Sequence, residues 1–171
     1  LHDALPICRL ALAAAVLLAA SGGSALAQDN WPTKPVRMVV PFSPGGSTDV
    51  VARMVGQRLS VLWNQPVVIE NRAGAGGNVG ADAVAKAAGD GYTLLMASGS
   101  VTINPSLYKR MPFDTKKDLM PITNVAQGPM LVVVQDGSPH RSLKDLVAAA
   151  KAKPGSINFA SAGVGSQGHL A

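Results

Sequence analysis

The chain has 171 residues, of which 47% are hydrophobic, 15% charged and 4% aromatic. This balance excludes a disordered polymer and fits one or two small domains. Its 15 Lys and Arg outnumber its 10 Asp and Glu and give a formal net charge of +5. The basic residues stand singly or in pairs, without a stripe of interleaved aromatic residues, so we expect no nucleic-acid partner.

Residues 1–27 have the order of a secretory signal peptide. Arg9 precedes an unbroken apolar run, residues 10–20, and the small-residue triplet Ala-Leu-Ala at 25–27 predicts cleavage before Gln28. The apolar run is about half of the roughly 20 residues that span a bilayer, so we expect no permanent anchor. Cys8, the single cysteine, precedes this run. The processed chain would then contain no cysteine and no disulfide, which fits a bacterial periplasmic protein better than a small eukaryotic secreted one.

Five short runs of apolar and β-branched residues are typical of buried strands. They are Val36 to Pro41, Val67 to Glu70, Tyr92 to Ala97, Met130 to Val134 and Ile157 to Ala160. Helical patterns lie between them. The first spans residues 48–63 and carries an apolar stripe that is predicted to face a core; the stripe consists of Val51, Met54, Val55, Leu59 and Leu62.

Two further helices have recognisable end signals. Asn78 is expected to cap the second helix, which would end at Gly89. Ser142 and Asp145 form an acidic variant of the capping box before a third helix, which would end ahead of the Pro-Gly pair at 154–155. This alternation of strands and helices predicts an α/β fold with a mainly parallel sheet.

Ligands of such folds bind beyond the carboxyl ends of the strands. Four loops rich in glycine and hydroxyl residues occupy these positions, at 41–49, 71–78, 98–100 and 161–168. A glycine-rich turn that leads into a helix presents free backbone N–H groups at the positive end of the helix dipole, and can hold a carboxylate without an arginine. The candidate ligand-binding residues are Gly45, Gly46, Ser47, Thr48, Asp49, Ser98, Ser161, Gly163, Gly165, Ser166 and His169.

Each of these loops also has a purely structural interpretation. The glycines would permit tight turns, and the serines and threonines would cap helices. Asp49 would then be a favourable charge at a helix N-terminus rather than a partner for a ligand ammonium or hydroxyl group. His169 would hydrogen-bond its own loop or cap the next helix.

The sequence contains only partial matches to catalytic and cofactor-binding motifs. Gly163, Gly165 and Gly168 match GxGxxG, but they follow the fifth expected strand instead of opening a first βαβ unit. Ser166 misses the GxSxG pattern because Val164 occupies the first glycine position, and neither HExxH nor CxxC occurs. We therefore expect no metal and no cofactor.

Several motifs occur together along the chain. They are WPTKPVR at 31–37, VPFSPGGSTD at 40–49, PVVIENRAGAGGNVG at 66–80, DGYTLL at 90–95, NPSLY at 104–108 and NFASAG at 158–163. In their order and spacing the chain resembles the substrate-binding receptors of tripartite tricarboxylate transporters, the Bug-type family.

The resemblance implies a periplasmic binding protein-like (type II) fold with two lobes that close on a small carboxylate. Residues 28–130 would form the first lobe and 131–171 the start of the second. Because a typical member is about twice as long, we interpret the sequence as an N-terminal fragment. Residues 43–49 would be one jaw and 161–169 the other, with main-chain N–H groups, hydroxyls and ordered waters as contacts.

The sequence leaves three functions open. The first is a monomeric, non-enzymatic periplasmic receptor that passes a di- or tricarboxylate, an amino acid or an aromatic acid to the permease subunits of a membrane transporter. The second is an exported α/β enzyme, either a hydrolase or a nucleotide-dependent enzyme. The third is a structural or adhesion module without a closing cleft. A receptor needs opposed anion-binding loops and no nucleophile paired with a base, and the sequence favours it.

Overall fold

The computed structural model describes residues 31–170, and all the elements below belong to the unit Pro32–Ala171. The expected signal peptide lies outside the described residues. Within the described part, no helix is both long and apolar enough to cross a membrane. The division into lobes at residues 130 and 131 stays a prediction.

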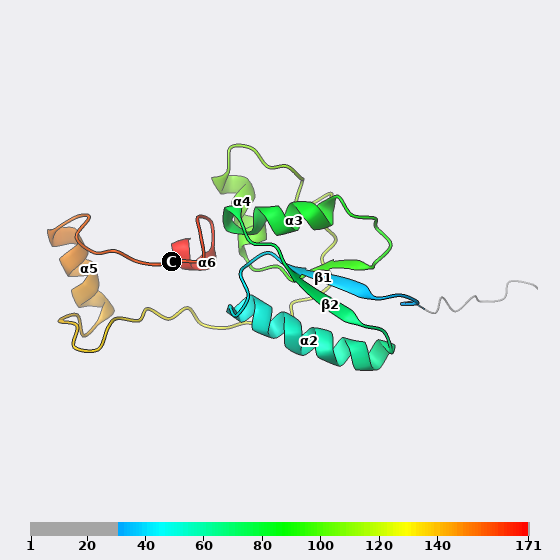
Figure 1. Cartoon of the computed structure of the whole chain (residues 1–171). Helices are drawn as coiled ribbons and strands as arrows, with labels where there is room; N and C mark the ends of the chain where they lie inside the picture. Colours follow the sequence, from blue (N-terminus) through cyan, green and yellow to red (C-terminus); the bar gives the residue numbers. More distant parts are fainter. Residues whose placement is uncertain (1–30, 171) are drawn as a thin grey trace, which may run out of the picture. The chain divides into compact units, whose positions relative to one another are not determined.

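A parallel sheet positions the loops of interest (Figure 1). It consists of β1 (Val36–Val40), β2 (Val67–Asn71) and β3 (Thr93–Leu95) in the order β2-β1-β3. Both pairings with β1 are parallel, and Met38 lies opposite Ile69 on one side and Leu94 on the other. The expected α/β fold with a parallel sheet is confirmed, and the loops that follow β1, β2 and β3 leave from the same edge.

Helices cover both faces of this sheet (Figure 1). Helix α2 (Ser47–Trp63) packs on β1 and β2, while α3 (Asn78–Ala85) packs on β1 and β3. The short helix η1 (Ala75–Gly77) runs directly into α3. The remaining helices are α4 (Ser100–Leu107), α5 (Leu143–Ala152) and α6 (Gln167–Leu170).

The core lies between α2 and the sheet, and it corrects the predicted stripe. Val51, Val55 and Leu59 pack against the buried core as expected. Met54 and Leu62 are instead 67% and 62% exposed. The helix is rotated so that small residues face the sheet, with Ala52 fully buried and Gly56 close enough that an added Cβ would lie 3.0 Å from Ile69 Cδ1. Small side chains allow the backbone of α2 to approach β2 more closely than a Leu or Met stripe would.

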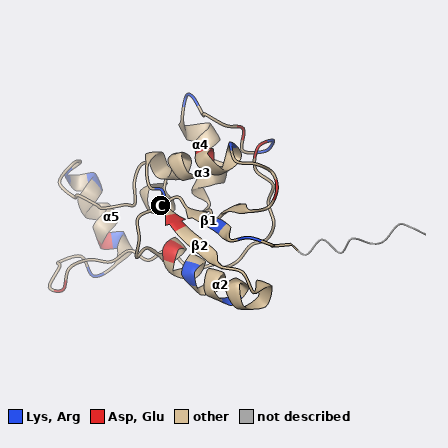
Figure 2. Ribbon diagram, turned by 45° about the vertical axis from the view of Figure 1, so that its right-hand side comes forward, with Lys and Arg blue, Asp and Glu red and all other residues tan. Residues whose placement is uncertain are grey.

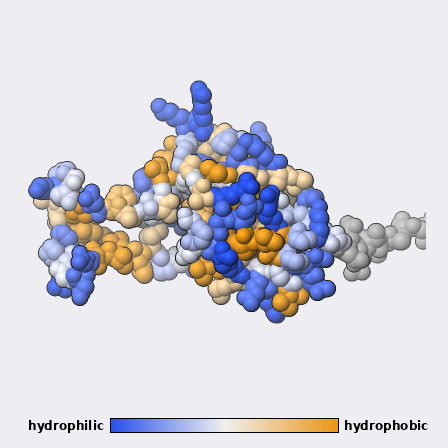
Figure 3. All heavy atoms as spheres, in the orientation of Figure 1, coloured by the Kyte–Doolittle hydropathy of each residue, from blue (hydrophilic) through white to orange (hydrophobic). Residues whose placement is uncertain are grey.

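Two of the five expected strands are absent from the described structure. Residues 130–134 and 157–160 have no regular secondary structure, and Val133 is 84% exposed. Apolar side chains of this part of the chain lie on the molecular surface (Figure 3). A β-branched run becomes a strand only when another strand takes its N–H and C=O groups, and no described segment pairs with these two.

The helix ends follow the sequence in part. Ser142 Oγ accepts a hydrogen bond from Asp145 N at 3.1 Å, so the capping box of α5 is confirmed. The prediction for Asn78 was wrong, because Gly77 is the N-cap of α3 and no side chain caps it. Asn78 Oδ1 accepts a bond from Asn104 Nδ2 instead. Helix α3 also ends at Ala85, earlier than the expected Gly89, and α4, which contains Pro105, was not predicted.

Charged residues of both signs are spread over the elements rather than gathered in one field (Figure 2). Most of the ion pairs are local or join neighbouring strands. Lys86 pairs with Asp82 one turn earlier in α3, and Glu70 of β2 pairs with Arg37 of β1 and with Arg72.

Candidate ligand site

The loops after β1 and β2 are joined by one side chain, that of Asn71 at the end of β2. Its Nδ2 donates to the carbonyl oxygen of Phe42 at 3.1 Å and to Asp49 Oδ1 at 2.9 Å. The backbone N–H of Arg72 also donates to Val40 O at 2.8 Å. These bonds fix the loop that leads into α2 against the loop that leads into η1.

Asp49 is a buried anchor of the first loop, with 2% of its surface exposed. Its Oδ2 accepts bonds from Arg53 Nε and from the backbone N–H of Gly45, both at 2.9 Å. The Arg53 guanidinium, followed by the Gly45 N–H and the Asn71 amide, holds the pKa of the Asp49 carboxyl well below its usual range. Both carboxylate oxygens are thus used inside the protein, and Asp49 is not among the residues that line the pocket described below.

The first turn of α2 has no side-chain cap. Gly46 is the N-cap, with φ −73° and ψ 165°, and it makes no side-chain capping bond. Within the described residues, the backbone N–H groups of Ser47 and Thr48 have no acceptor. These two donors lie at the positive end of the dipole of a helix of 17 residues. The arrangement is the one that anions favour at helix N-termini.

Consecutive residues of the loop after β2 have positive φ angles. Gly74, Gly76 and Gly77 have φ of 139°, 62° and 99°, and Ala75 has φ 47°. This run of positive φ requires glycine at most positions. Asn104 of α4, which is fully buried, holds the turn in place: its Nδ2 donates to Gly76 O at 3.1 Å and to the Asn78 side chain at 2.8 Å.

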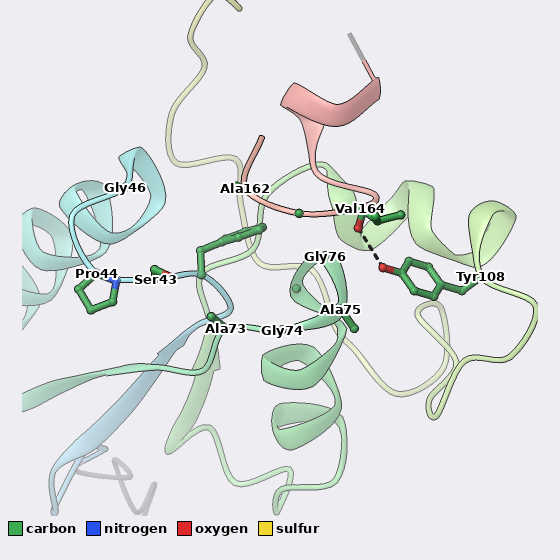
Figure 4. A pocket seen from close by; sticks show the side chains of 13 residues that line it. Ser43, Pro44, Gly46, Ala73, Gly74, Ala75, Gly76, Tyr108, Ala162 and Val164 are labelled. Carbon is green, nitrogen blue, oxygen red and sulfur yellow. Dashed lines mark hydrogen bonds between the residues drawn. The ribbon is translucent and has the colours of Figure 1, made fainter. Parts of the chain in front are cut away.

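A pocket of about 750 Å³ lies between these loops and a segment far along the chain. Figure 4 shows this segment, at Ala162 and Val164, across the pocket from the turn at 73–76. None of the lining residues is Asp, Glu, Lys, Arg or His. The lining consists of Phe42, Ser43, Pro44, Gly46, Ala73, Gly74, Ala75, Gly76, Gly77, Tyr108, Ala162, Gly163 and Val164.

The structure brings some of the candidate residues together at this pocket. Gly46 and Gly163 line it; Gly45 and Ser47 adjoin Gly46 in the chain, and Thr48 follows Ser47. Ser161 is exposed beside the other wall, where its Oγ accepts a bond from Gly163 N at 3.3 Å.

The remaining candidates lie outside the lining. Ser98 Oγ is hydrogen-bonded to Ser100 Oγ at 2.8 Å, at the start of α4. Ser166 is buried, and its Oγ has no partner among the described residues. His169 Nδ1 accepts a hydrogen bond from Gly165 N at 3.5 Å. This is a bond within its own loop, as the structural interpretation of His169 predicted.

Several lining residues were missed by the sequence reasoning. The turn at 73–77 was recognised as glycine-rich, yet none of its residues was named as a candidate. Tyr108 was missed because a tyrosine after an NPSL run carries no chemical signal of its own. The signal that could have identified the turn and Tyr108 was that both lie in motifs of the family resemblance, at 66–80 and 104–108.

The chemistry available here is anion binding by neutral donors. Gly46, the N-cap of α2, the glycine turn at 74–77, and the hydroxyl residues Ser43 and Tyr108 line an otherwise apolar cavity. No cluster of three or more His, Cys, Asp or Glu residues that could hold a metal occurs within residues 31–170. A small molecule with a carboxylate head and an apolar body matches this lining.

Comparison with known proteins places this chain among transport receptors. The family model described as "Tripartite tricarboxylate transporter family receptor" matches residues 51–171. Protein BugT of Bordetella pertussis is 43% identical over 165 residues, which cover 95% of this chain and 51% of BugT. A protein encoded in the tcbD-tcbE intergenic region of a Pseudomonas species is 40% identical and is covered to the same 51%. The chain spans about half the length of the curated relatives it matches.

Solved structures agree with the sequence relatives. The structure of R. palustris Rpa4515 with adipate is 39% identical with a TM-score of 0.76, over 82% of this chain and 47% of the other. The periplasmic binding protein BugD is 35% identical with a TM-score of 0.70, over the same shares. MatC from Rhodopseudomonas palustris with bound malate is 34% identical with a TM-score of 0.68, over 80% of this chain and 47% of MatC. The α/β fold is therefore that of the corresponding part of periplasmic binding proteins.

Proposed function

The chain belongs to the tripartite tricarboxylate transporter receptor family, and on that premise we propose that it forms part of a periplasmic receptor for a small carboxylate. The observation that carries the proposal is the pocket at the uncapped start of α2, lined without a single charged side chain. A receptor that must release its cargo to a permease benefits from neutral donors, because they avoid the strong ion pair that an arginine would make.

Neutral donors are sufficient for this task. A hydrogen bond to a charged group contributes about 1.5 to 3 kcal/mol, and the start of a helix adds about 0.3 to 1 kcal/mol. The N–H groups of Ser47 and Thr48, which have no acceptor within the described residues, supply two such bonds. Two bonds and the helix term together reach several kcal/mol, which is the range of micromolar to millimolar binding.

The class of ligand is proposed from the chemistry of the lining and from the neighbours. Two of the similar structures are described with adipate and with malate, which are both dicarboxylates. The proposed ligands are di- or tricarboxylates, amino acids or aromatic acids. The loops of this chain would bind the carboxylate group. Residues of the receptor outside this chain would help to decide which carboxylate is bound.

Location and partners follow from the same proposal. Residues 1–27 would direct export, with cleavage before Gln28, and the receptor would act in the periplasm as a monomer. Its partners would be the permease subunits of a tripartite transporter. Within the described residues the candidate hydroxyls of Ser98 and Ser161 are bonded to Ser100 Oγ and Gly163 N rather than to a base, so the proposed role is capture without catalysis.

Native mass spectrometry of the receptor in its full natural length, purified without refolding, tests this proposal. A retained mass equal to that of a carboxylic acid, together with calorimetric binding of adipate or malate, is the expected result. Conversion of either probe to a product would instead indicate the exported enzyme. Failure of carboxylates from all three proposed classes to bind would remove the receptor assignment.

A further inference from the structure

One tyrosine connects two walls of the pocket that lie far apart in the sequence. Tyr108, directly after α4, donates from its hydroxyl to the carbonyl oxygen of Val164 at 2.9 Å, across 56 residues (Figure 4). Both residues line the pocket. Ser161 and Gly163, which the sequence analysis named as ligand residues, belong to the same loop as Val164, so this bond controls where that loop lies.

The fit of this loop depends on two glycines. A Cβ on Gly76 would clash with the carbonyl oxygen of Val164, the same atom that accepts the tyrosine bond. A Cβ on Gly165 would clash with Asn104 Oδ1 and would lie 3.1 Å from Leu107 Cδ2 and 3.3 Å from Tyr108 Cε2. The Val164 carbonyl thus sits in a notch that exists only because positions 76 and 165 have no side chain. Such a close fit is specific to this seated position of the loop.

The seated position also carries a cost. Asn104 Oδ1 and Ser166 Oγ are both buried without a hydrogen-bond partner within the described residues. A buried acceptor or hydroxyl that has lost water without gaining a partner disfavours the arrangement that buries it. The Tyr108 bond and the glycine fit favour seating, while the two unpartnered groups oppose it. The position of this loop therefore depends on the Tyr108 bond and on the glycine fit.

We propose that Tyr108 is a positioning residue that seats the 163–166 loop on α4 and η1 and so completes the second wall of the ligand pocket. The hydroxyl of Tyr108 acts on the ligand through the Val164 carbonyl, which it holds in the notch left by Gly76 and Gly165. The seating itself is independent of ligand identity. Only its effect on ligand affinity rests on the proposed receptor function.

The variant Tyr108→Phe removes the hydroxyl and keeps the ring, so it tests the bond without emptying the site. Its matched control is Tyr92→Phe, because the Tyr92 hydroxyl accepts a bond from Thr33 N, away from the pocket. Hydrogen exchange in the receptor of full natural length, without ligand, measures the seating directly. We expect the amides of residues 165–167 to exchange about 2- to 13-fold faster in Tyr108→Phe, the loss of one ordinary hydrogen bond, and unchanged in the control.

A second variant separates seating from a general loss of stability. Gly76→Ala blocks the notch, so Tyr108→Phe should have no further effect on exchange of residues 165–167 in that background. Additive effects of the two substitutions would overturn the proposal, as would unchanged exchange in Tyr108→Phe alone. The single variant decides the matter even if Gly76→Ala fails to fold.

Titration with adipate and malate then relates seating to capture. Where the parent receptor binds either probe, Tyr108→Phe should weaken binding about 2- to 13-fold through faster dissociation. Unchanged affinity together with faster exchange would show that Tyr108 positions the 163–166 loop without affecting ligand binding, and would overturn its role in the pocket. Absence of binding in the parent would count against the proposed function, whereas the exchange result would still decide the seating.

Discussion

Asn71 donates from its side-chain amide to the Asp49 carboxylate at 2.9 Å, and this bond ties the end of β2 to the first turn of α2 across 22 residues. The same amide donates to Phe42 O, so one side chain sets the path of the loop that contains Gly45 and Gly46. The loop therefore brings Gly46, the N-cap of α2, to the pocket while the Asp49 carboxylate stays turned inward.

Asp49→Asn should lower the thermal stability of the protein and flatten its pH dependence. The folded-state pKa of Asp49 is depressed by Arg53, Gly45 and Asn71. Its contribution to stability is therefore complete above the pKa of about 3.9 that an unfolded Asp has, and it is lost as the pH falls toward the folded-state pKa. Thermal melts from pH 6 down to pH 2 measure this difference.

The control for this prediction is Asp136→Asn, at an exposed position. It should follow the parent curve at every pH. Glu70, Asp90 and Asp114 also have depressed pKa values and give all variants a common acid-sensitive background. A parallel pH curve for Asp49→Asn and its parent would contradict the anchoring role.

Ser47→Pro should weaken carboxylate binding without destabilising the fold. Ser47 is the first residue of α2, where proline is tolerated because its missing N–H has no helical acceptor to lose. Gly46 already has the extended backbone that precedes a proline. Loss of one N–H to a carboxylate should weaken binding by about 1.5 to 3 kcal/mol, roughly 10- to 150-fold, as measured by calorimetry.

The companion variant Ser47→Ala removes the hydroxyl and keeps the backbone donor. Affinity close to that of the parent is expected if the N–H group holds the ligand. Equal losses in both variants would assign the contact to the Ser47 hydroxyl, and full affinity in Ser47→Pro would place the carboxylate elsewhere in the pocket.

Asn104→Ala should destabilise the protein by about 1 to 3 kcal/mol, because it leaves the Gly76 carbonyl and the Asn78 side chain without their donor in a buried site. Denaturant unfolding measures the change in the free energy of unfolding. Asn158→Ala, at an exposed position, is the matched control and should change it little. Equal stability of the two variants would show that the turn at 74–77 keeps its shape without Asn104.

Ser142→Ala should reduce the helix content of α5. The cap bond to Asp145 N is worth about 0.5 to 2 kcal/mol, and α5 has no buried residue that would compensate for its loss. Far-ultraviolet circular dichroism of the parent and the variant measures the difference. Ser142→Asp keeps an acceptor at the cap and should retain the helix; a loss of helix in that variant too would point away from the cap.

Local signals in the sequence located most of the elements near the site. The β-branched runs of β1, β2 and β3, the position of α2 and the cap of α5 depend on residues within a few positions of each other. For the same reason the glycine-rich loops at the strand ends were recognised as candidate anion sites. A segment whose structure needs a distant partner, such as residues 130–134, gave a strand pattern without forming a strand in the described chain.

The sequence by itself determined the alternation of strand and helix segments and the position of the glycine-rich loops at strand ends, because chain neighbours decide these features; the parallel sheet was inferred from that alternation. Only the tertiary structure decided that Asp49 faces inward, that Asn78 pairs with Asn104 across 26 residues, and that Tyr108 meets Val164 across 56. Such pairings depend on which side of a helix faces the sheet and on how closely two backbones approach. Small residues such as Gly56 and Gly76 allow neighbouring segments to approach closely at these points. A local sequence pattern does not show which segment will lie there.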